Sequence, residues 1–367
     1  MTEADRLDHA FLAGVRAWER GDANGFANEA LFNEHARALF AYQIERNKPY
    51  ASLAALRGFN RARLPPSWRD IPAVPAGAFK DATLATFDAR RAELEFHTSG
   101  TTAARSGKHY LERAALYDAA LLAGFDRFML ADRMKLRFLN LVPNPRIKPH
   151  SSLGYMMGHA SVLRGDGKAA WFLDDEHLDV DGFIQALRAA IAQAQPVCIP
   201  GTAFAFVALL DALDERNETF AAPAGSRIME TGGFKGRTRA VTREELYARL
   251  ETRLGIAQRA IVAEYGMTEL ISQYYDTPAS RTEKIRIKTA PPWLRTLVVD
   301  GEGREVSDGT VGFLRHIDLG NRSSVLAVET EDRGYSVEGG IVLLGRESDA
   351  PPRGCSLDME DLRAITP

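Results

Sequence analysis

The stretch Ala263-Glu-Tyr-Gly-Met-Thr-Glu-Leu270 follows an apolar run that begins at Ala260. The run is typical of a buried strand, and the residues after it bring together an aromatic ring, a glycine, a hydroxyl and a carboxylate. Tyr265 and Gly266 offer a surface for a purine, Thr268 can reach a phosphate, and Glu269 can hold Mg²⁺ directly or through water. An ordinary strand end is the alternative interpretation.

Around this stretch the pattern of the chain predicts an α/β architecture. From residue 96 to about residue 290, short apolar runs alternate with helical segments. Residues 136–142 and 196–199 are typical of strands, and residues 181–194 and 242–254 are typical of helices. Residues 1–75 predict a helical N-terminal layer, and residues 294–345 predict a small β subdomain of short strands and turns. We therefore expect one domain over residues 1–345 and a short tail over residues 346–367.

A polar loop follows the predicted strand that contains Phe96. Its sequence is His97-Thr-Ser-Gly-Thr-Thr102, and the spacing to Gly107 excludes a P-loop. Hydroxyl and backbone N–H groups in such a loop can wrap a polyphosphate. The candidate phosphate-binding residues are Ser99, Gly100, Thr101 and Thr102. A polar surface turn is the alternative.

Two further patterns point to a nucleotide. Gly232 and Gly233 follow an apolar run, and paired glycines let a flat ring approach the backbone. Asp332 can accept hydrogen bonds from both ribose hydroxyls, and Arg346 can contact ribose or phosphate.

The bulk properties exclude several classes of protein. The chain has 367 residues, of which 45% are hydrophobic and 26% charged, with a net charge of −3. This charge provides no field for a nucleic-acid backbone. No apolar run is long enough to cross a bilayer, and the acidic N-terminus does not resemble a secretory signal. We expect a cytoplasmic enzyme.

The two cysteines have different surroundings. Cys198 lies in the apolar segment Pro196-Val-Cys-Ile-Pro200, which predicts an inert buried thiol. Cys355 lies in the polar segment Arg353-Gly-Cys-Ser356 near the C-terminus. Their spacing provides neither a metal site nor a disulfide framework.

Taken in their order along the chain, the four patterns resemble the adenylate-forming superfamily of acyl- and aryl-CoA ligases, luciferases and peptide-synthetase adenylation domains. Residues 98–102 resemble its phosphate loop, residues 265–269 its adenine and Mg²⁺ motif, residues 330–332 its ribose motif and residues 345–349 its hinge. The resemblance implies ATP and Mg²⁺ as cofactors. It also implies the fold of the superfamily's large N-terminal domain, with the swinging C-terminal domain absent or reduced to a short tail.

From about residue 70 onward the chain is also similar to the bacterial luminescence-type acyl-protein synthetases, which are fatty acid–protein ligases. The resemblance rests on residues 74–80, 151–156, 201–206, 230–237, 264–270 and 353–357. It implies that a fatty acid and ATP form acyl-AMP. The acyl group then moves to Cys355 as a thioester and on to a partner protein, plausibly an acyl reductase.

Two features depart from the superfamily pattern. Ala103 and Ala104 stand where its phosphate loop usually has Gly and Pro. The lysine that its C-terminal domain contributes to adenylation has no counterpart after Lys288. The charge must then come from Mg²⁺, from Arg346 or Arg353, from another lysine of the chain such as Lys235, or from a partner chain.

The sequence signals for the residues that bind the acid are less specific than those for the nucleotide. His150, Ser151, Gly201 and Thr202 are candidate substrate-binding residues. The apolar side chains of Phe204, Phe206 and Met156 are candidates for an acyl tunnel. A loop histidine and ordinary core packing are the alternatives.

Three functions therefore compete. The first is an acyl-protein synthetase that uses Cys355, and the second is a ligase that passes the acyl group to coenzyme A or another diffusible acceptor. The third is a non-catalytic nucleotide-binding protein. The presence of Thr268, Glu269 and Asp332 argues against the third, and the expected absence of the C-terminal domain argues against the second. The identity of the acid is left open.

Overall fold

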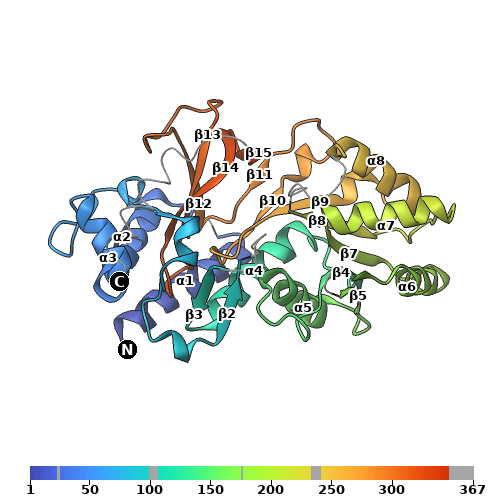
Figure 1. The fold of residues 1–367 in the computed structure, drawn as a ribbon, viewed down its shortest axis with the longest axis horizontal. Coiled ribbons are helices and arrows are strands. Elements are labelled where there is room, and N and C mark those ends of the chain that lie inside the picture. The colour runs from blue at the N-terminus through green and yellow to red at the C-terminus, as the bar shows by residue number, and fades with distance from the viewer. Residues whose placement is uncertain (23–24, 99–105, 175–176, 233–240, 347–367) are drawn as a thin grey trace. The chain divides into compact units, whose positions relative to one another are not determined.

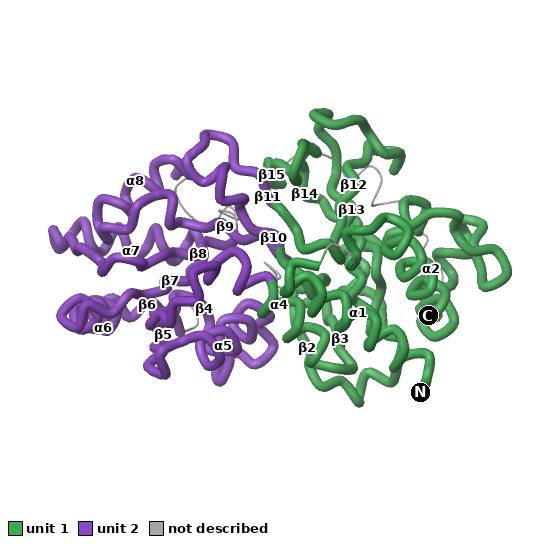
Figure 2. Tube along the Cα trace, turned by 180° about the vertical axis from the view of Figure 1, so that it is seen from behind, with its two compact units in different colours: residues 1–123, 267–273, 289–367 green, residues 124–266, 274–288 purple. Residues whose placement is uncertain are grey.

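The computed structural model describes residues 1–22, 25–98, 106–174, 177–232 and 241–346 (Figure 1). The chain divides into two compact units, which are coloured separately in Figure 2. Unit 1 comprises residues 1–123, 267–273 and 289–367, and unit 2 comprises residues 124–266 and 274–288. Each unit is described by itself below.

Unit 1 begins with the helices predicted for the N-terminal layer: α1 (Glu3–Glu19), α2 (Glu29–Arg46) and α3 (Lys48–Leu56). Thr2 starts α1 through a capping box, in which its hydroxyl accepts from the Asp5 N–H at 3.1 Å and the Asp5 carboxylate accepts from the Thr2 N–H at 3.0 Å. The periodic side chains Leu7, Phe11 and Val15 are buried along one face of this helix.

The β subdomain of unit 1 is an antiparallel sheet in the order β12 (Leu294–Val299), β13 (Gly312–Asp318), β14 (Ala327–Val337) and β15 (Gly340–Arg346). The short β1 (Val74–Pro75) pairs in parallel with β14. A separate hairpin joins β2 (Leu94–His97) to β3 (Lys108–Leu111). The antiparallel strands predicted from residue 294 onward are present, and β14 continues well beyond the apolar residues that predicted it.

Unit 2 is built on a mostly parallel sheet. Its strands β9 (Ile261–Tyr265), β8 (Arg227–Thr231), β7 (Val197–Thr202), β4 (Arg137–Pro143) and β5 (Ala170–Asp174) are neighbours in that order. Two short strands run antiparallel beside them: β10 (Tyr274–Asp276) on β9 and β6 (His177–Leu178) on β5. Parallel strands place their carboxyl ends at one edge of the sheet, where ligands usually bind in such folds.

Helices alternate with these strands, as the sequence predicts for an α/β core. They are α4 (Ala114–Phe128), which contains the boundary between the units, α5 (Ser152–Arg164), α6 (Val180–Ala192), α7 (Ala203–Glu215) and α8 (Arg243–Leu254). The Thr242 hydroxyl caps α8 by accepting from the Glu245 N–H at 3.1 Å, and Gly255 ends it with φ 69°. Helix α7 packs against α8, and Phe183, Phe206 and Leu250 belong to the hydrophobic core beneath them (Figure 1).

The remaining elements are short: η1 (Trp68–Asp70), η2 (Ala76–Lys80), η3 (Ala89–Arg91), η4 (Gln258–Ala260), η5 (Pro278–Ser280) and β11 (Lys288–Thr289). Among the described segments, no helix is both long and apolar enough to span a lipid bilayer.

Candidate active site

The predicted site residues fall into three groups. Outside the described residues lie Ser99, Gly100, Thr101, Thr102, Gly233, Lys235 and Cys355. Unit 1 contains Thr268, Glu269, Asp332 and Arg346. Unit 2 contains His150, Ser151, Gly201, Thr202, Gly232, Tyr265 and Gly266.

Thr268 and Glu269 occupy the two central positions of a tight turn. The turn is closed by the Leu270 N–H, which donates to the Met267 carbonyl oxygen at 3.2 Å. Two turn residues with fixed backbones present their side chains in a defined direction, as a binding site requires.

A buried histidine and a buried asparagine hold the backbone of this turn. His109 Nδ1 lies 2.7 Å from the Thr268 carbonyl oxygen, and Asn321 Nδ2 donates to the Glu269 carbonyl oxygen at 2.9 Å. His109 Nε2 lies 2.9 Å from Asn321 Oδ1, so the two side chains also contact each other. Both are fully buried. Sequence reasoning missed this pair, because neither residue belongs to a recognisable motif.

Asp318 fixes the chain immediately after the turn. Its carboxylate accepts hydrogen bonds from the N–H groups of Ile271 and Ser272, each at 3.0 Å, and from the Ser272 hydroxyl at 2.9 Å. Burial raises the pKa of Asp318 to about 6, against the opposing effect of these hydrogen bonds. The turn is therefore anchored on both sides.

Glu269 is a buried carboxylate, only 8% exposed, that forms no ion pair with any described residue. Burial raises its pKa to about 7; the charges of Arg346 and Lys80 oppose the shift, and that of Asp332 adds to it. A buried carboxylate without a cation is costly unless a ligand supplies the charge. Carboxylate oxygens are ligands that Mg²⁺ prefers, so Glu269 fits the predicted metal role.

Asp332 and Arg346 face each other across two neighbouring strands. They are register partners in β14 and β15, and Arg346 Nε donates to Asp332 Oδ1 at 2.8 Å. The Asp332 N–H in turn donates to the Thr330 hydroxyl at 3.1 Å. The side chain of Arg346 is 57% exposed and that of Asp332 is 14% exposed, so a ribose or phosphate can compete for the guanidinium more easily than for the carboxylate.

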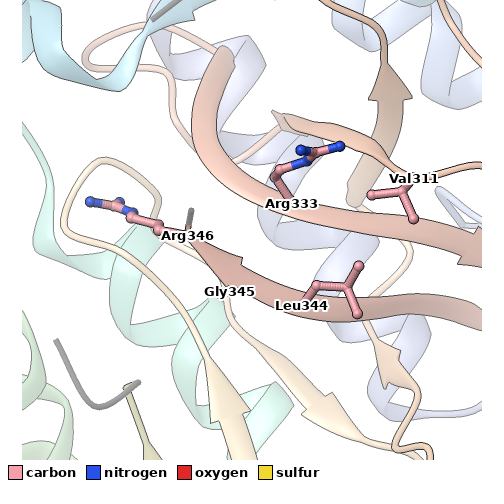
Figure 3. Close-up of a pocket in the computed structure, with 5 residues that line it drawn as sticks. All are labelled: Val311, Arg333, Leu344, Gly345 and Arg346. Carbon is pink, nitrogen blue, oxygen red and sulfur yellow. The ribbon is translucent and has the colours of Figure 1, made fainter. Parts of the chain in front are cut away.

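A small pocket of about 190 Å³ lies beside this pair, lined by Val311, Arg333, Leu344, Gly345 and Arg346 (Figure 3). In Figure 3 the two guanidinium groups point in different directions. Pockets for small molecules usually enclose roughly 300–1,000 Å³, so this one is too small for a whole nucleotide.

The two ends of the predicted phosphate loop meet in unit 1. Thr98 N–H donates to the Gly107 carbonyl oxygen at 2.9 Å, and the Gly107 N–H donates to the Thr98 hydroxyl at 2.8 Å. In the strands that lead to these ends, Glu95 contacts Lys108 Nζ at 2.9 Å and His97 Nε2 at 2.7 Å.

In unit 2, Gly232 and Tyr265 lie at the carboxyl ends of the neighbouring parallel strands β8 and β9. Gly232 has φ 73°, a conformation that favours glycine, and apart from its chain neighbours no atom of the described residues lies within 4 Å of the position of a Cβ. The Tyr265 ring lies 5.6 Å from that of Tyr274, centroid to centroid, at an angle of 44°. The adenine role of these residues stays a prediction.

Three acidic and hydroxyl side chains lie just before these strand ends. Thr231 and Glu264 are register partners, and the Thr231 hydroxyl donates to the Glu264 carboxylate. Burial raises the pKa of Glu264 to about 7, despite this bond and the charge of Lys288. Burial also raises the pKa of Glu230, whose carboxylate accepts from the Tyr247 hydroxyl at 3.0 Å.

A buried ionic cluster that sequence reasoning missed supports β9. Asp276 is fully buried and contacts Arg286 at 2.7 Å and Lys288 at 2.9 Å. It also accepts from the Ala263 N–H at 2.9 Å, while Lys288 Nζ donates to the Ala263 carbonyl oxygen at 2.6 Å. Burial alone would raise the pKa of Asp276, but the two cations lower it. The cluster therefore fixes the strand immediately before Glu264 and Tyr265.

The predicted acid-binding residues of unit 2 have clear structural roles. The Ser151 hydroxyl caps α5 through the Gly154 N–H at 3.0 Å, and the Thr202 hydroxyl caps α7 through the Ala205 N–H at 3.1 Å. A Cβ on Gly201 would lie 2.8 Å from the Phe206 ring, so this position needs glycine for packing. His150 is exposed. Their contact with the acid stays a prediction.

Of the tunnel candidates, Met156 and Phe206 are buried and Phe204 is 40% exposed. Cys198 is fully buried, and burial raises the pKa of its thiol to about 12. A thiol in this environment is a poor nucleophile.

Residues 27–362 match the family described as acyl-protein synthetase, LuxE. Among curated proteins, the long-chain-fatty-acid–luciferin-component ligase of Aliivibrio fischeri is 22% identical over 80% of this chain and 79% of its own length. The enzyme of the same name from Vibrio harveyi is 21% identical over 98% of this chain and 93% of its own length.

Among solved structures, an open conformation of 2-hydroxyisobutyryl-CoA ligase in complex with 2-HIB-AMP and CoA shares the fold. Its TM-score is 0.65 at 14% identity, over 89% of this chain and 76% of that one. The comparisons confirm the α/β fold expected from the adenylate-forming resemblance. They also confirm the narrower resemblance and, with it, the enzyme class, an acid–thiol ligase of the acyl-protein synthetase type.

Proposed function

The chain belongs to the LuxE family of acyl-protein synthetases, and we propose on this premise that it uses ATP to activate a fatty acid as acyl-AMP. The observation that carries the proposal is the family match over residues 27–362. The two curated relatives are named for long-chain fatty acids, which supports a fatty acid as the substrate here.

In the proposed first step, a carboxylate oxygen of the acid attacks the α-phosphorus of ATP. A C–O–P linkage forms, the bond between the α-phosphorus and its bridging oxygen breaks, and pyrophosphate leaves with the electron pair. The protein forms no covalent bond in this step, so its contribution is positioning and stabilisation of charge. Thr268 would contact the phosphates, and Asp332 and Arg346 would bind the ribose.

Glu269 would hold Mg²⁺, because its buried carboxylate has no ion pair among the described residues. When bound, Mg²⁺ would neutralise negative charge on the phosphate oxygens. The hydrogen bonds donated by Asn321 and His109 to its carbonyl oxygens would keep the Thr268–Glu269 turn in place.

In the proposed second step, the acyl group moves to the Cys355 thiolate and then to a protein partner, such as an acyl reductase. The thiolate attacks the acyl carbon, a thioester forms, and AMP leaves. The support for this step is family membership together with the position of Cys355 in the sequence. A ligase that passes the acyl group to coenzyme A or another diffusible acceptor is the competing function.

Acid-dependent pyrophosphate exchange tests the first step. The full chain is incubated with ATP, Mg²⁺, labelled pyrophosphate and one acid from a panel of short, medium and long fatty acids and benzoic acid. We expect exchange with at least one fatty acid, and intact-mass spectrometry should then show the acyl adduct on the protein. A chain that binds ATP but exchanges label with none of the acids is not an acyl-activating enzyme.

A further inference from the structure

Lys80 ends a short segment of unit 1 that the proposed mechanism does not use. The segment η2 (Ala76–Lys80) follows β1 directly, and β1 is aligned with β14 through the register pairs Val74–Val328 and Pro75–Glu329. Strand β14 leads from these positions to Asp332. The sheet thus determines where η2 begins.

Phe79 connects Lys80 to the turn that carries Thr268. The buried Phe79 ring packs edge-on against the His109 ring, with centroids 5.6 Å apart and an interplanar angle of 85°. His109 in turn contacts the Thr268 carbonyl oxygen at 2.7 Å. The residue before Lys80 therefore packs directly against the imidazole that fixes the turn.

The backbone of Phe79 also lies against the end of the predicted phosphate loop. A Cβ built on Gly107 would lie 3.0 Å from the Phe79 carbonyl carbon and 3.1 Å from its oxygen. Gly107 is joined to Thr98 by two hydrogen bonds. Lys80 therefore directly follows the residue that lies against the Gly107 end of that loop.

The charge of Lys80 is available for a ligand. Its side chain is exposed and forms no ion pair with any residue that the structure describes. Its charge nevertheless acts on the carboxylate of Glu269, which also has no ion pair. Lys80 and Glu269 are thus two opposite charges of unit 1 that act on each other with no ion pair between them.

Other described cations near these positions already have partners. Arg346 donates to Asp332 at 2.8 Å, and Lys108 contacts Glu95 at 2.9 Å. Lys80 differs from these two cations, since it has no ion pair among the residues that the structure describes.

We propose that the ammonium group of Lys80 binds the phosphates of ATP on the side of Glu269, as a catalytic residue of the adenylation step. The catalytic role of Lys80 rests on the proposed function. Binding of the ATP phosphates by Lys80 does not, because it requires no carboxylic acid substrate. Lys80 stays protonated throughout and transfers no proton. Its charge offsets the negative charge that pyrophosphate carries as it leaves.

The test uses the full chain with Lys80→Ala, Lys80→Arg and the control Lys48→Ala, an exposed lysine of unit 1 at the start of α3. Calorimetry measures the affinity for MgATP and for AMP, and circular dichroism checks the fold of each variant. Lys80→Ala should weaken MgATP by roughly ten- to a hundredfold, the effect of losing one charged hydrogen bond. AMP, which lacks the β- and γ-phosphates, should bind within about twofold of wild type. Lys80→Arg should recover most of the loss, and Lys48→Ala should bind both nucleotides like wild type.

Equal losses for ATP and AMP, or no loss for either, would overturn the assignment of Lys80. Pyrophosphate exchange separates this failure from failure of the proposed function. If wild type exchanges label with an acid and Lys80→Ala does so at the same rate and the same KM for ATP, the lysine has no catalytic role while the function stands. If no acid supports exchange but Lys80→Ala selectively weakens MgATP, the proposed function and the catalytic part fail and the phosphate contact stands.

Discussion

His109 Nδ1 lies 2.7 Å from the carbonyl oxygen of Thr268, although the two residues are 159 positions apart in the sequence. The contact attaches the strand after the predicted phosphate loop to the turn that contains the candidate Mg²⁺ ligand. Asn321 adds a second attachment by donating to the Glu269 carbonyl oxygen. Two motifs that the sequence presents separately are thus parts of one hydrogen-bonded assembly in unit 1.

Asn321→Ala should impair exchange by loosening the turn. The substitution leaves the Glu269 carbonyl oxygen and His109 Nε2 without a partner in a buried place, so we expect a loss of roughly 1–3 kcal/mol of unfolding free energy. The Mg²⁺ concentration for half-maximal pyrophosphate exchange should also rise. Urea unfolding and a Mg²⁺ titration measure the two effects.

Asn140→Ala is the matched control, since Asn140 is equally buried in unit 2 and donates to the Ala170 carbonyl oxygen at 3.0 Å. It should lose similar stability without changing the Mg²⁺ dependence. If both variants shift the Mg²⁺ titration alike, the role assigned to Asn321 is incorrect.

Glu269→Gln tests the metal role directly. Glutamine keeps the size of the side chain but removes the negative charge, so exchange should fall at least about tenfold while acid binding is retained. Pyrophosphate exchange across a Mg²⁺ titration measures the first quantity, and fluorescence with a labelled fatty acid measures the second. A titration curve that coincides with wild type would exclude Glu269 as the ligand.

Asp332→Ala should weaken nucleotide binding. The loss of charged hydrogen bonds to the ribose predicts a decrease of about 1–3 kcal/mol in binding free energy, measured by calorimetry with AMP. Asp308→Ala provides the control, because Asp308 is an exposed carboxylate of unit 1 that accepts from the Ser336 hydroxyl at 2.6 Å. Unchanged AMP affinity in a folded Asp332→Ala variant would contradict the ribose assignment.

Glu264→Gln should change how stability depends on pH. Burial raises the pKa of Glu264 from 4.5 to about 7, so the folded state holds the proton more tightly than the unfolded chain. The stability contributed by the protonated form is complete below the unfolded pKa of 4.5 and is lost as pH rises through about 7. Glutamine cannot ionise. As the pH rises from 5 to 8, the unfolding free energy of the variant should therefore increase by roughly 1–3 kcal/mol relative to that of wild type.

Urea unfolding at both pH values measures this difference. Glu230, Lys288 and Thr231 all act on the same carboxylate, and none of them changes in the comparison. The control Glu244→Gln replaces an exposed glutamate of α8 and should follow wild type at each pH. Parallel curves for Glu264→Gln and wild type would show that Glu264 ionises normally.

Cys355→Ser separates the two competing enzymes. Adenylation needs no thiol, so the variant should still exchange pyrophosphate, but it should carry no hydroxylamine-labile acyl label. Cys198→Ser should label like wild type, because burial raises the pKa of that thiol to about 12. Incubation with labelled acid, followed by hydroxylamine treatment and peptide mapping, measures the acyl label on both variants. If Cys355→Ser labels as wild type does, the acyl group passes to another acceptor.

Local sequence was sufficient for much of the fold and for the motif residues. The apolar periodicity of α1, the cap at Thr242 and the apolar run of β9 each depend on neighbours within a few positions, and the structure confirms all three elements. Short sequence segments, such as residues 74–80 and 264–270, were likewise enough to identify the family that the match over residues 27–362 shows.

Tertiary structure alone decided which other residues serve those motifs. His109 and Asn321 are 212 positions apart, and Lys80 follows a phenylalanine that packs on His109. The Asp276 cluster became visible only when the strands were placed side by side. Hydrogen bonds and charges act through space over a few ångströms, so residues distant in sequence leave no periodic pattern along the chain when they meet. The sequence determined which reactive and binding residues the motifs contain, and the fold determined which distant residues hold them in place.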